Sequence, residues 1–342
     1  MKRVSVVVGS RADFYILKPL IEALKEAGLL TDWCNLRYLD QEGVIHKLNS
    51  FYSHKGLGSE ATIVLGDRSE ILLAAFFSVL HKIPVIHLHG GEITRGSMDE
   101  YFRHAITKLS MLHFTSTEQY RKRVISMGEA PDMVHAVGSI GVWRLLKQPR
   151  VEGINSADIV VCYHPDTMES KTKEEVDELV AALRTFRDHK IMIIGPNKDD
   201  GHEIVEERMK SLAYLYNNIT YTDDLGDDYI WICANAKVCV GNSSSFVIEV
   251  PSLGTPVVLV GERQSGRLCA DSVIPANTNR ANIIANITDV LNMTNEARAI
   301  LSRMNNPYEP KEDPIEKIIE VIKETPATFK KEFYENPMRN TR

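Results

Sequence analysis

The sequence predicts an α/β protein with two doubly wound parallel-sheet domains that face a central cleft. Three observations lead to this fold class. The chain has 342 residues, a length that suits two domains of ordinary size. Short apolar runs rich in Val and Ile alternate with segments of helical periodicity, as expected of parallel strands joined by helical crossovers. This alternation is interrupted near residue 150 and then starts again.

The first domain is expected to occupy residues 1–148. Its opening run is shorter than a signal-peptide core and ends in a polar turn, so it is interpreted as a strand. The expected elements, in chain order, are the strand VSVVVG, a helix over 16–27, the strand TIVLGD, a helix over 69–81, the strand PVIHLHGG, a helix over 98–109, the strand MLHFTS, a helix over 118–127 and the strand VHAVGS.

A linker and a second α/β series follow. Residues 149–157 contain proline, glycine and polar residues with little periodicity, which is typical of a linker. Residues 314–342 are expected to form an amphipathic helix over 314–324 and a tail that pack back toward the first domain. The second domain, residues 158–313, is expected to contain DIVVCYHP, a helix over 173–188, KIMIIGPN, a helix over 201–212, NITYTD, a helix over 227–234, KVCVGN, a helix after 245, PVVLVG and ADSVIPA.

Composition and charge exclude several function classes. The formal net charge is −6 and no basic run is present, which argues against nucleic acid as a partner. No apolar segment approaches the length that crosses a bilayer, so a soluble protein without a membrane partner is expected. The five cysteines are scattered without CxxC spacing, as is typical of reduced core thiols in a cytoplasmic protein. The expected partner is therefore a small molecule.

Two strand-to-helix turns carry the residue types of an anion site. In open parallel sheets, ligands bind beyond the carboxyl ends of strands, where helix N-termini converge. In GSRADF, Ser10 is expected to cap the next helix and Arg11 to stand at its positive end; an ordinary capped turn explains this motif equally well. In GNSSSFVIE the three serines, expected at the start of a helix, suit a phosphate, whereas a simple cap uses one serine only. Glu249 is expected one turn inside this helix, where it suits ribose hydroxyls.

Acidic residues gather after the strands of the first domain. The set, with its companion arginines, is Asp67, Arg68, Glu70, Glu92, Asp99 and Arg103. Carboxyl groups crowded into a partly dry cleft raise one another's pKa, so that some hold a proton near neutral pH while others act as bases. Such a set is suited to moving a proton at carbon. A helix cap or a salt bridge is the structural alternative for each acid, and for Glu70 it is as good an explanation as function.

Histidines support a rival hypothesis, a metal-dependent hydrolase. His87 and His89 are two apart in an expected strand and so are expected on one face, where the acids Asp67 and Glu92 and His104 would complete a metal site. A lone HxH is a weak signal, and the anion-binding turns would then have no role. His164, in YHPDT, is expected at the cleft edge, where it would donate to a phosphate or a sugar hydroxyl.

Together and in this order, the motifs resemble the UDP-N-acetylglucosamine 2-epimerase family, especially its hydrolysing branch of the sialic-acid and nonulosonate pathways. The similarity is most specific over GDRSEILLAAFFSVLHKIPVIHLHGGEITRGSMDEYFRHAITKLS and the residues after it, and over NSSSFVIEVPSLGTPVVLVGERQSGR. It spans nearly the whole chain. The resemblance implies a glycosyltransferase-B-like pair of Rossmann-like domains and a homodimer or larger assembly built on helices of the first domain.

The resemblance also implies roles for single residues. Asp67, Glu92 and Asp99 match the essential acids of the family. Its ligands of the nucleotide diphosphate match Arg11, His164, Asn197, Ser244, Ser245 and Glu249, with Arg263 and Arg267 nearby. We count His164 among the catalytic residues and add Arg68, Arg103 and Ser243 to the predicted binding residues. No cofactor or metal is implied if Arg11, His164 and the helix N-termini supply the positive charge.

The implied reaction is an elimination followed by hydration. A base removes the proton at C2 while the nucleotide diphosphate leaves C1, which gives a glycal, formally the 1,2-ene of the hexosamine. Water then adds at C1 while C2 is reprotonated from the opposite face, so that an N-acetylmannosamine-type sugar is released. The leaving diphosphate requires cationic neutralisation, and C2 requires a base and a proton donor on the other face.

One departure from the family pattern leaves the substrate open. Between Trp33 and Glu60 the chain is shorter than in relatives and lacks their TGxHL-type segment, which helps to build the cleft floor. A glycosyltransferase of the same fold and hydrolysis of the nucleotide sugar without inversion at C2 remain as alternatives. The sequence does not distinguish uracil from guanine, because backbone groups usually read the base. Nor does it distinguish N-acetylglucosamine from a 2,4-diacetamido sugar.

Overall fold

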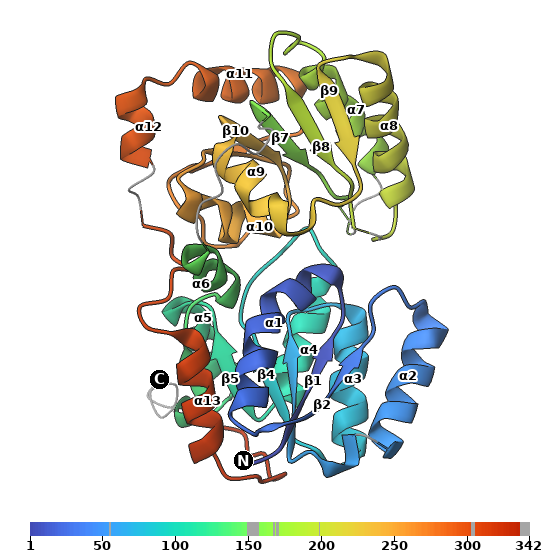
Figure 1. Ribbon diagram of the computed structural model, residues 1–342, viewed down its shortest axis with the longest axis vertical. Helices are drawn as coiled ribbons and strands as arrows, with labels where there is room; N and C mark the ends of the chain where they lie inside the picture. Colours follow the sequence, from blue (N-terminus) through green and yellow to red (C-terminus); the bar gives the residue numbers. More distant parts are fainter. Residues whose placement is uncertain are drawn as a thin grey trace. The chain divides into compact units, whose positions relative to one another are not determined.

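The computed structural model describes residues 1–54, 56–148, 157–166, 168, 171–197, 199–301 and 305–335. The predicted linker, residues 149–157, lies outside them apart from Ala157, as do residues 336–342 of the expected tail. The chain forms two compact units, each built on one six-stranded sheet (Figure 1). Unit 1 comprises Met1–Glu92, Asp99–Arg144 and Tyr308–Arg342, and unit 2 comprises Ile93–Met98 and Leu145–Pro307.

The sheet of unit 1 is parallel throughout and has the strand order β2-β1-β3-β4-β5-β6. Its strands are β1 Val4–Val8, β2 Leu30–Asn35, β3 Ala61–Leu65, β4 Val85–Leu88, β5 Leu112–Thr115 and β6 Val134–Ala136. The helices between them are α1 Arg11–Glu26, α2 Gln41–His54, α3 Ser69–Leu80, α4 Asp99–Leu109 and α5 Glu118–Ser126, with short 3₁₀ turns at Gly56–Gly58 and Pro131–Met133. Helix α6, Ile140–Lys147, follows β6, and its residues from Leu145 on belong to unit 2. Because β1, β3 and β4 are parallel neighbours in this order, their carboxyl ends meet at one edge of the sheet.

The alternation of side chains along β1 shows that helices cover both faces of this sheet. Val4, Val6 and Val8 belong to a core that includes leucines of α1 and isoleucines of α13 (Pro314–Glu324). Val7 belongs to a second core, which contains residues of α2, α3 and Ile106 of α4. A strand buried on both sides needs a continuous apolar run, and VSVVV supplies it.

The C-terminal part of the chain belongs to unit 1. Helix α13 begins at Pro314, capped by Asp313, and packs beside α1. The ammonium group of Met1 donates to the carbonyls of Ile322 and Thr325, at 2.8 and 2.6 Å. The two ends of the described chain are therefore tied to the same domain.

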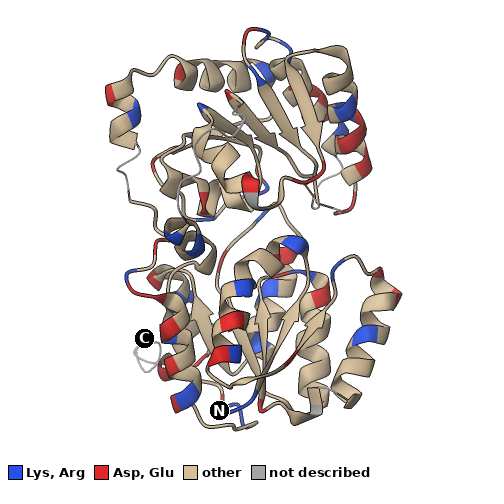
Figure 2. Ribbon diagram, viewed as in Figure 1, with Lys and Arg blue, Asp and Glu red and all other residues tan. Residues whose placement is uncertain are grey.

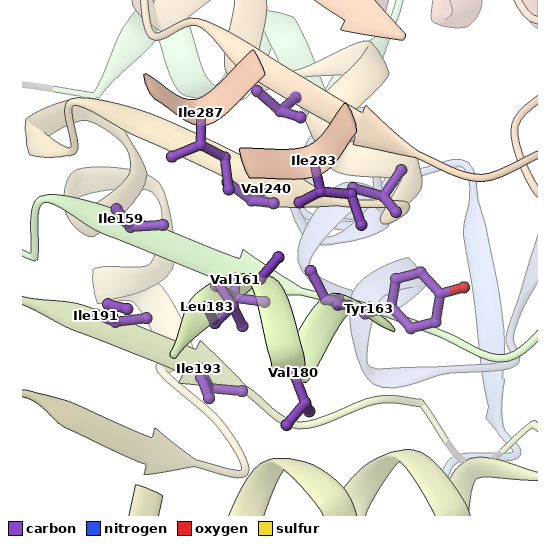
Figure 3. Close-up of a cluster of buried hydrophobic side chains, with 14 of the residues drawn as sticks. Ile159, Val161, Tyr163, Val180, Leu183, Ile191, Ile193, Val240, Ile283 and Ile287 are labelled. Carbon is purple, nitrogen blue, oxygen red and sulfur yellow. The ribbon is translucent and has the colours of Figure 1, made fainter. Parts of the chain in front are cut away.

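Unit 2 repeats the architecture with the strand order β12-β11-β10-β7-β8-β9, again all parallel. Its strands are β7 Ile159–Cys162, β8 Ile191–Ile194, β9 Ile219–Thr222, β10 Val238–Gly241, β11 Val257–Val260 and β12 Val273–Ala276. Its helices are α7 Thr172–Leu183, α8 His202–Leu215, α9 Tyr229–Asn235, α10 Ser244–Ile248, α11 Arg280–Leu291 and α12 Asn295–Leu301, with 3₁₀ turns at Gly226–Asp228 and Val250–Leu253. Figure 3 shows one face of this sheet, where Val161 and Ile193 meet Leu183 of α7 and Ile283 and Ile287 of α11.

The prediction of two doubly wound parallel domains is confirmed, and every element expected from the sequence is present, most of them with shifted ends. The structure adds β2, α2, α6, α11 and α12, which the sequence analysis did not predict. Of the described strands, β2 alone carries a charged residue, Asp32, and charges otherwise lie on helices and loops (Figure 2). None of the helices in the described ranges is both long and apolar enough for a membrane span.

Candidate active site

The first cluster of predicted residues lies where β3 and β4 of unit 1 end. Gly66, with φ of 82°, turns the chain after β3, and its N–H donates to the carbonyl of Leu88 at 3.0 Å. Asp67 follows this turn, and the segment His89–Glu92 follows β4. The register pairs Leu65 with Leu88, so both segments leave the sheet at the same level.

Arg103 of α4 joins these segments. Its side chain is fully buried, and its Nε donates to Oδ2 of Asp67 at 3.0 Å, with a second contact from Nη2. Nη1 donates to the backbone carbonyl of Glu92 at 3.1 Å and to Oε2 of Glu100 at 2.7 Å. The fork of a guanidinium is suited to such a bridge, and it stabilises the negative charge on Asp67. The structure thus brings the predicted residues Asp67, Glu92 and Arg103 together.

Glu92 is buried, with 3% of its side chain exposed, and has two neighbours at the strand ends. Its Oε1 accepts a hydrogen bond from Oγ of Ser116, just after β5, at 3.0 Å. The same oxygen lies 4.0 Å from Nδ1 of His89, whose side chain is 11% exposed. Ser116 was not predicted as a site residue; its place after a strand was the available signal.

The remaining acids of this cluster lie on α4. Asp99 is the first residue of the helix and is partly exposed, one turn before Arg103 on the same face. Glu100 accepts from Arg103 with one oxygen, and its Oε1 lies 3.0 Å from Nε2 of His104. Glu100 was not predicted, although its i, i+3 and i, i+4 spacing to two basic side chains is visible in the sequence.

The turn after β1 places an acid beside the predicted anion ligand Arg11. Ser10 caps α1 as expected, in a reciprocal box with Asp13 at 2.8 and 3.2 Å. Burial raises the pKa of the Asp13 carboxyl to about 6, against the lowering effects of the Ser10 hydrogen bonds and of Arg68. Arg68 itself donates to Glu70 at 2.7 Å. Asp13 was not predicted as a site residue, although the Ser-x-x-Asp spacing in the sequence indicates its place in the helix cap.

The rival metal site is not assembled. Among the described residues there is no group of three or more His, Cys, Asp or Glu side chains arranged to hold a metal ion. His87 uses both ring nitrogens inside the protein: Nε2 donates to the carbonyl of Gly66 at 2.8 Å and Nδ1 lies 3.2 Å from the hydroxyl of Thr107. Burial lowers the pKa of His87 to about 3, so the ring is neutral.

The expectation that His87 and His89 share a strand face is also wrong. β4 ends at Leu88, and His89 has a left-handed backbone with φ of 64°, so the alternation of a strand does not extend to it. The sequence shows HxH but does not reveal where the strand stops.

The second cluster of predicted residues is a network of amides around His164 in unit 2. Asn242, after β10, accepts from the His164 N–H at 2.7 Å and donates to the His164 carbonyl at 2.8 Å. The backbone N–H of Asn197 donates to Nδ1 of His164 at 3.1 Å, which leaves the proton of the neutral ring on Nε2. That nitrogen lies 3.6 Å from the sulfur of the buried Cys162. The structure therefore joins His164 and Asn197, with contact made by the backbone of Asn197.

The serine-headed helix is shorter than expected. Ser243 is the N-cap residue of α10, Ser244 is exposed, and Glu249 is the residue at which the helix ends. Oγ of Ser245 lies 3.1 Å from Oγ of Ser243 and also contacts the hydroxyl of Tyr229. The expectation that Glu249 lies inside the helix is wrong, because Pro251 leads the chain into a 3₁₀ turn over Val250–Leu253.

The loop after β11 holds the predicted arginines in different settings. Arg263 is buried, donates to Asp199 at 2.8 Å and contacts the carbonyl of Pro165. Arg267, further along the loop, is partly buried. Gln264, which was not predicted, is buried and donates to the carbonyl of Asn242 at 2.9 Å.

The chain between Glu92 and Asp99 belongs to unit 2 and packs on this same loop. Arg95 donates its N–H to the carbonyl of Ser265 at 3.0 Å. Gly96 approaches so closely that an added Cβ would lie 2.7 Å from Cα of Arg263. Two predicted acids of unit 1 are therefore joined by a segment that the loop of unit 2 holds.

Comparisons with known proteins place the chain in a family. The family model described as UDP-N-acetylglucosamine 2-epimerase matches residues 45–323. The polysialic acid biosynthesis protein P7 of Escherichia coli is 30% identical, and the alignment covers 98% of each chain. The UDP-N,N'-diacetylbacillosamine 2-epimerase (hydrolyzing) of Legionella pneumophila is 34% identical over 68% of this chain and 64% of its own.

Solved structures of the same kind share the fold. The UDP-GlcNAc 2-epimerase of Neisseria meningitidis, determined with UDP-GlcNAc bound, aligns with a TM-score of 0.77 at 16% identity and covers 94% of this chain and all of its own. The predicted glycosyltransferase-B-like class is confirmed. On the match to residues 45–323 and the full-length relative, the chain belongs to the UDP-N-acetylglucosamine 2-epimerase family.

Proposed function

We propose that this protein is a hydrolysing 2-epimerase of a nucleotide-diphosphate-linked N-acetylhexosamine, with an N-acetylmannosamine-type sugar and the nucleotide diphosphate as products. The observation that carries the proposal is the network of Asp67, Arg103 and Glu92 at the carboxyl ends of β3 and β4, in a chain of this family. The names of the relatives from Legionella pneumophila and Escherichia coli support the hydrolysing mode and a sialic-acid-type pathway.

The predicted site residues serve two steps, the departure of the diphosphate and the transfer of the proton at C2. We propose that Arg11 and the positive end of α1 offset the charge of the diphosphate, and that the neutral His164 ring and the serines of α10 stabilise it as hydrogen-bond donors. The acids of unit 1 exchange the proton at C2. Arg103 has its nitrogens engaged by Asp67, Glu92 and Glu100, so we assign it to positioning these groups instead of binding substrate.

The proposal is tested with purified protein, UDP-N-acetylglucosamine, UDP-N,N'-diacetylbacillosamine and GDP-N,N'-diacetylbacillosamine in deuterated water, followed by NMR. We expect one of them to give free nucleotide diphosphate and a manno-configured sugar with deuterium at C2. Release of a sugar with unchanged configuration and no deuterium would show simple hydrolysis. Transfer to an added acceptor sugar would show a glycosyltransferase.

We also propose that the protein is a homodimer formed by helices of unit 1. On α3, Phe76 and Leu80 are 49% and 60% exposed, four residues apart and so on one face of the helix. Replacement of Phe76 by Glu is expected to convert a dimer to a monomer in light scattering. An unchanged mass for the variant, or a monomeric wild type, would overturn this assignment.

A further inference from the structure

We propose that the segment Ile93–Met98 is a positioning element for the proton transfer, and that its packing on the loop 261–268 sets where the acids Glu92 and Asp99 lie. Gly96 is the positioning residue at the centre of this packing. The inference rests on the proposed function and deepens it, because it gives residues of unit 2 a part in the chemistry of the acids of unit 1.

The course of the chain is the first observation. Glu92 belongs to unit 1, Ile93–Met98 belongs to unit 2, and Asp99 returns the chain to unit 1 as the first residue of α4. Both predicted acids are therefore direct neighbours of the segment in the chain. Three residues span at most about 11 Å, so a fixed Gly96 limits the places that Asp99 can take.

The second observation is the close packing of Gly96 on the loop. An added Cβ would lie 2.7 Å from Cα of Arg263 and 2.8 Å from the carbonyl oxygen of Glu262, both of which are backbone atoms. Gly96 lies in a tight turn, in which the N–H of Ser97 donates to the carbonyl of Thr94 at 3.1 Å. Its φ is not in the left-handed region, so the close approach of the loop backbone is what requires a glycine here.

Two further contacts hold the part of the segment that precedes Gly96. The N–H of Arg95 donates to the carbonyl of Ser265 at 3.0 Å. Ile93 meets the loop at Gly266, where an added Cβ would lie 2.4 Å from Cγ2 of Ile93. The segment therefore rests on the loop along most of its length.

The third observation is that the loop is fixed to the cluster around His164. The side-chain amide of Gln264 donates to the carbonyl of Asn242 at 2.9 Å, and Arg263 donates to Asp199 at 2.8 Å. Both side chains of the loop are buried. The place of the segment thus depends on the same hydrogen bonds that order the proposed diphosphate ligands.

The two acids differ in how they are held from within unit 1. The carboxylate of Glu92 accepts from Ser116 and its carbonyl accepts from Arg103. Asp99 stands at the start of α4, where the first backbone N–H groups of a helix have no partner within the helix. Its position is therefore the one that depends more on the preceding segment.

The first test places a methyl group between the segment and the loop. Gly96→Ala adds the Cβ that meets the backbone of Arg263, so the segment must move. Gly58→Ala is the matched control, because its added Cβ would lie 3.6 Å from the nearest atom, Cγ2 of Thr31, which is an ordinary contact. The readouts are kcat for the nucleotide sugar that the wild type turns over, the Kd for its nucleotide diphosphate, and the free energy of unfolding.

We expect Gly96→Ala to lower kcat by about 10²-fold, because a misplacement of about 1 Å at reacting groups costs that much. The Kd is expected to stay within about threefold of the wild type, since the change affects the transition state and not nucleotide binding. Gly58→Ala should match the wild type in both. Turnover of Gly96→Ala within about threefold of the wild type would overturn the assignment. A parallel loss of nucleotide affinity would do the same, because the effect would then lie in unit 2 alone.

The second test lengthens the connection and leaves the packing as it is. One glycine is inserted between Ser97 and Met98, which frees Asp99 from the segment, and a loop longer by one residue costs little stability. The control is one glycine inserted between Lys311 and Glu312, which are both exposed and precede α13.

We expect the insertion after Ser97 to lower kcat by about 10-fold or more with an unchanged Kd, and the control insertion to leave both unchanged. If Gly96→Ala does not fold, this comparison decides. Equal turnover of the two insertion variants would overturn the inference. A wild type that releases no manno-configured sugar with deuterium at C2 would overturn the proposed function instead, before any variant is compared.

Discussion

The two clusters of predicted residues, one in each unit, are each held by a different kind of interaction. In unit 1 the interactions are between charged side chains. The buried Arg103 donates to both Asp67 and Glu100, and Glu92 lies beside His89. In unit 2, neutral side-chain amides hold the cluster by hydrogen bonds. Asn242 bonds to the N–H and the carbonyl of His164, and Gln264 donates to the carbonyl of Asn242. Charges suit a site that must accept and return a proton, while fixed neutral donors suit a site that must hold an anion.

This contrast predicts that loss of charge in unit 1 affects turnover most. Arg103→Met leaves two carboxylates without their buried partner, which is expected to lower kcat by about 10³-fold or more and to cost about 3–5 kcal/mol of stability. Arg103→Lys keeps the positive charge but not the forked guanidinium, so smaller losses of kcat and of stability are expected. Steady-state kinetics, calorimetric Kd for the nucleotide diphosphate and chemical denaturation measure these effects. A matching loss of nucleotide affinity would contradict the division of labour.

Acid is expected to loosen unit 1 before unit 2, through a second charged cluster. Glu129 accepts from Lys108 at 2.6 Å, from Lys331 of the C-terminal segment at 2.7 Å and from His113 at 3.1 Å. Burial alone would raise the pKa of Glu129, but these three partners lower it to about 2. The stabilisation is therefore present above pH 4.5 and is lost as the pH falls toward 2.

The variant Glu129→Gln measures how much this cluster contributes to the free energy of unfolding. We expect it to cost about 3 kcal/mol near neutral pH and almost nothing at pH 2. Hydrogen exchange of peptides from unit 1 reports the loss, with peptides from unit 2 as an internal reference. Glu118→Gln, in an exposed pair with Arg121, serves as the control. Equal effects of the two variants would show that burial of the cluster has no energetic consequence.

In unit 2, the matching prediction concerns binding. Asn242→Ala removes both hydrogen bonds to His164 and leaves buried backbone groups unsatisfied, which is expected to weaken nucleotide binding by about 2 kcal/mol. Deuterium content of the product should stay as in the wild type. Asn235→Ala, at the end of α9, is the control for amide loss elsewhere in the unit. A lower kcat with unchanged affinity would contradict the assignment of nucleotide binding to this cluster.

The smallest expected effect concerns Asp13. Because burial raises the pKa of this carboxyl from 3.8 to about 6, its ionisation destabilises the fold as the pH rises through that window. Asp13→Asn keeps an acceptor for the Ser10 N–H and is expected to stabilise the protein by about 1–2 kcal/mol at pH 8, with no gain below pH 4. Denaturation at the two pH values tests this, and an equal shift at both would contradict the ionisation argument.

The fold was largely predictable because the strands are continuous apolar runs. β3, ATIVL, and β11, VVLV, are buried along their whole length and stand out from their surroundings. β2, LTDWCN, was missed because it is an edge strand that is largely half-buried and carries Asp32. α2 was missed because Gly43 and mixed polar residues weaken its pattern. Its place in the core of unit 1 is set by tertiary packing of Val44, Leu48 and Phe51.

Of the candidate site, the sequence predicted only which residues follow the ends of strands. The rule that ligands bind after parallel strands correctly grouped Asp67 and Glu92. It did not show that Arg103 is buried, that Asn197 contacts His164 through its backbone, or that His89 lies beyond its strand. These facts depend on side-chain burial and on local φ angles, which residue types and spacing do not determine.

The central claim is that unit 1 moves a carbon-bound proton during loss of the nucleotide. It is tested most directly with a nucleotide sugar deuterated at C2 and turned over in ordinary water. The account predicts slower turnover than for the protiated substrate and a manno-configured product without deuterium. A product that keeps its deuterium at C2, formed at the unlabelled rate, would contradict it.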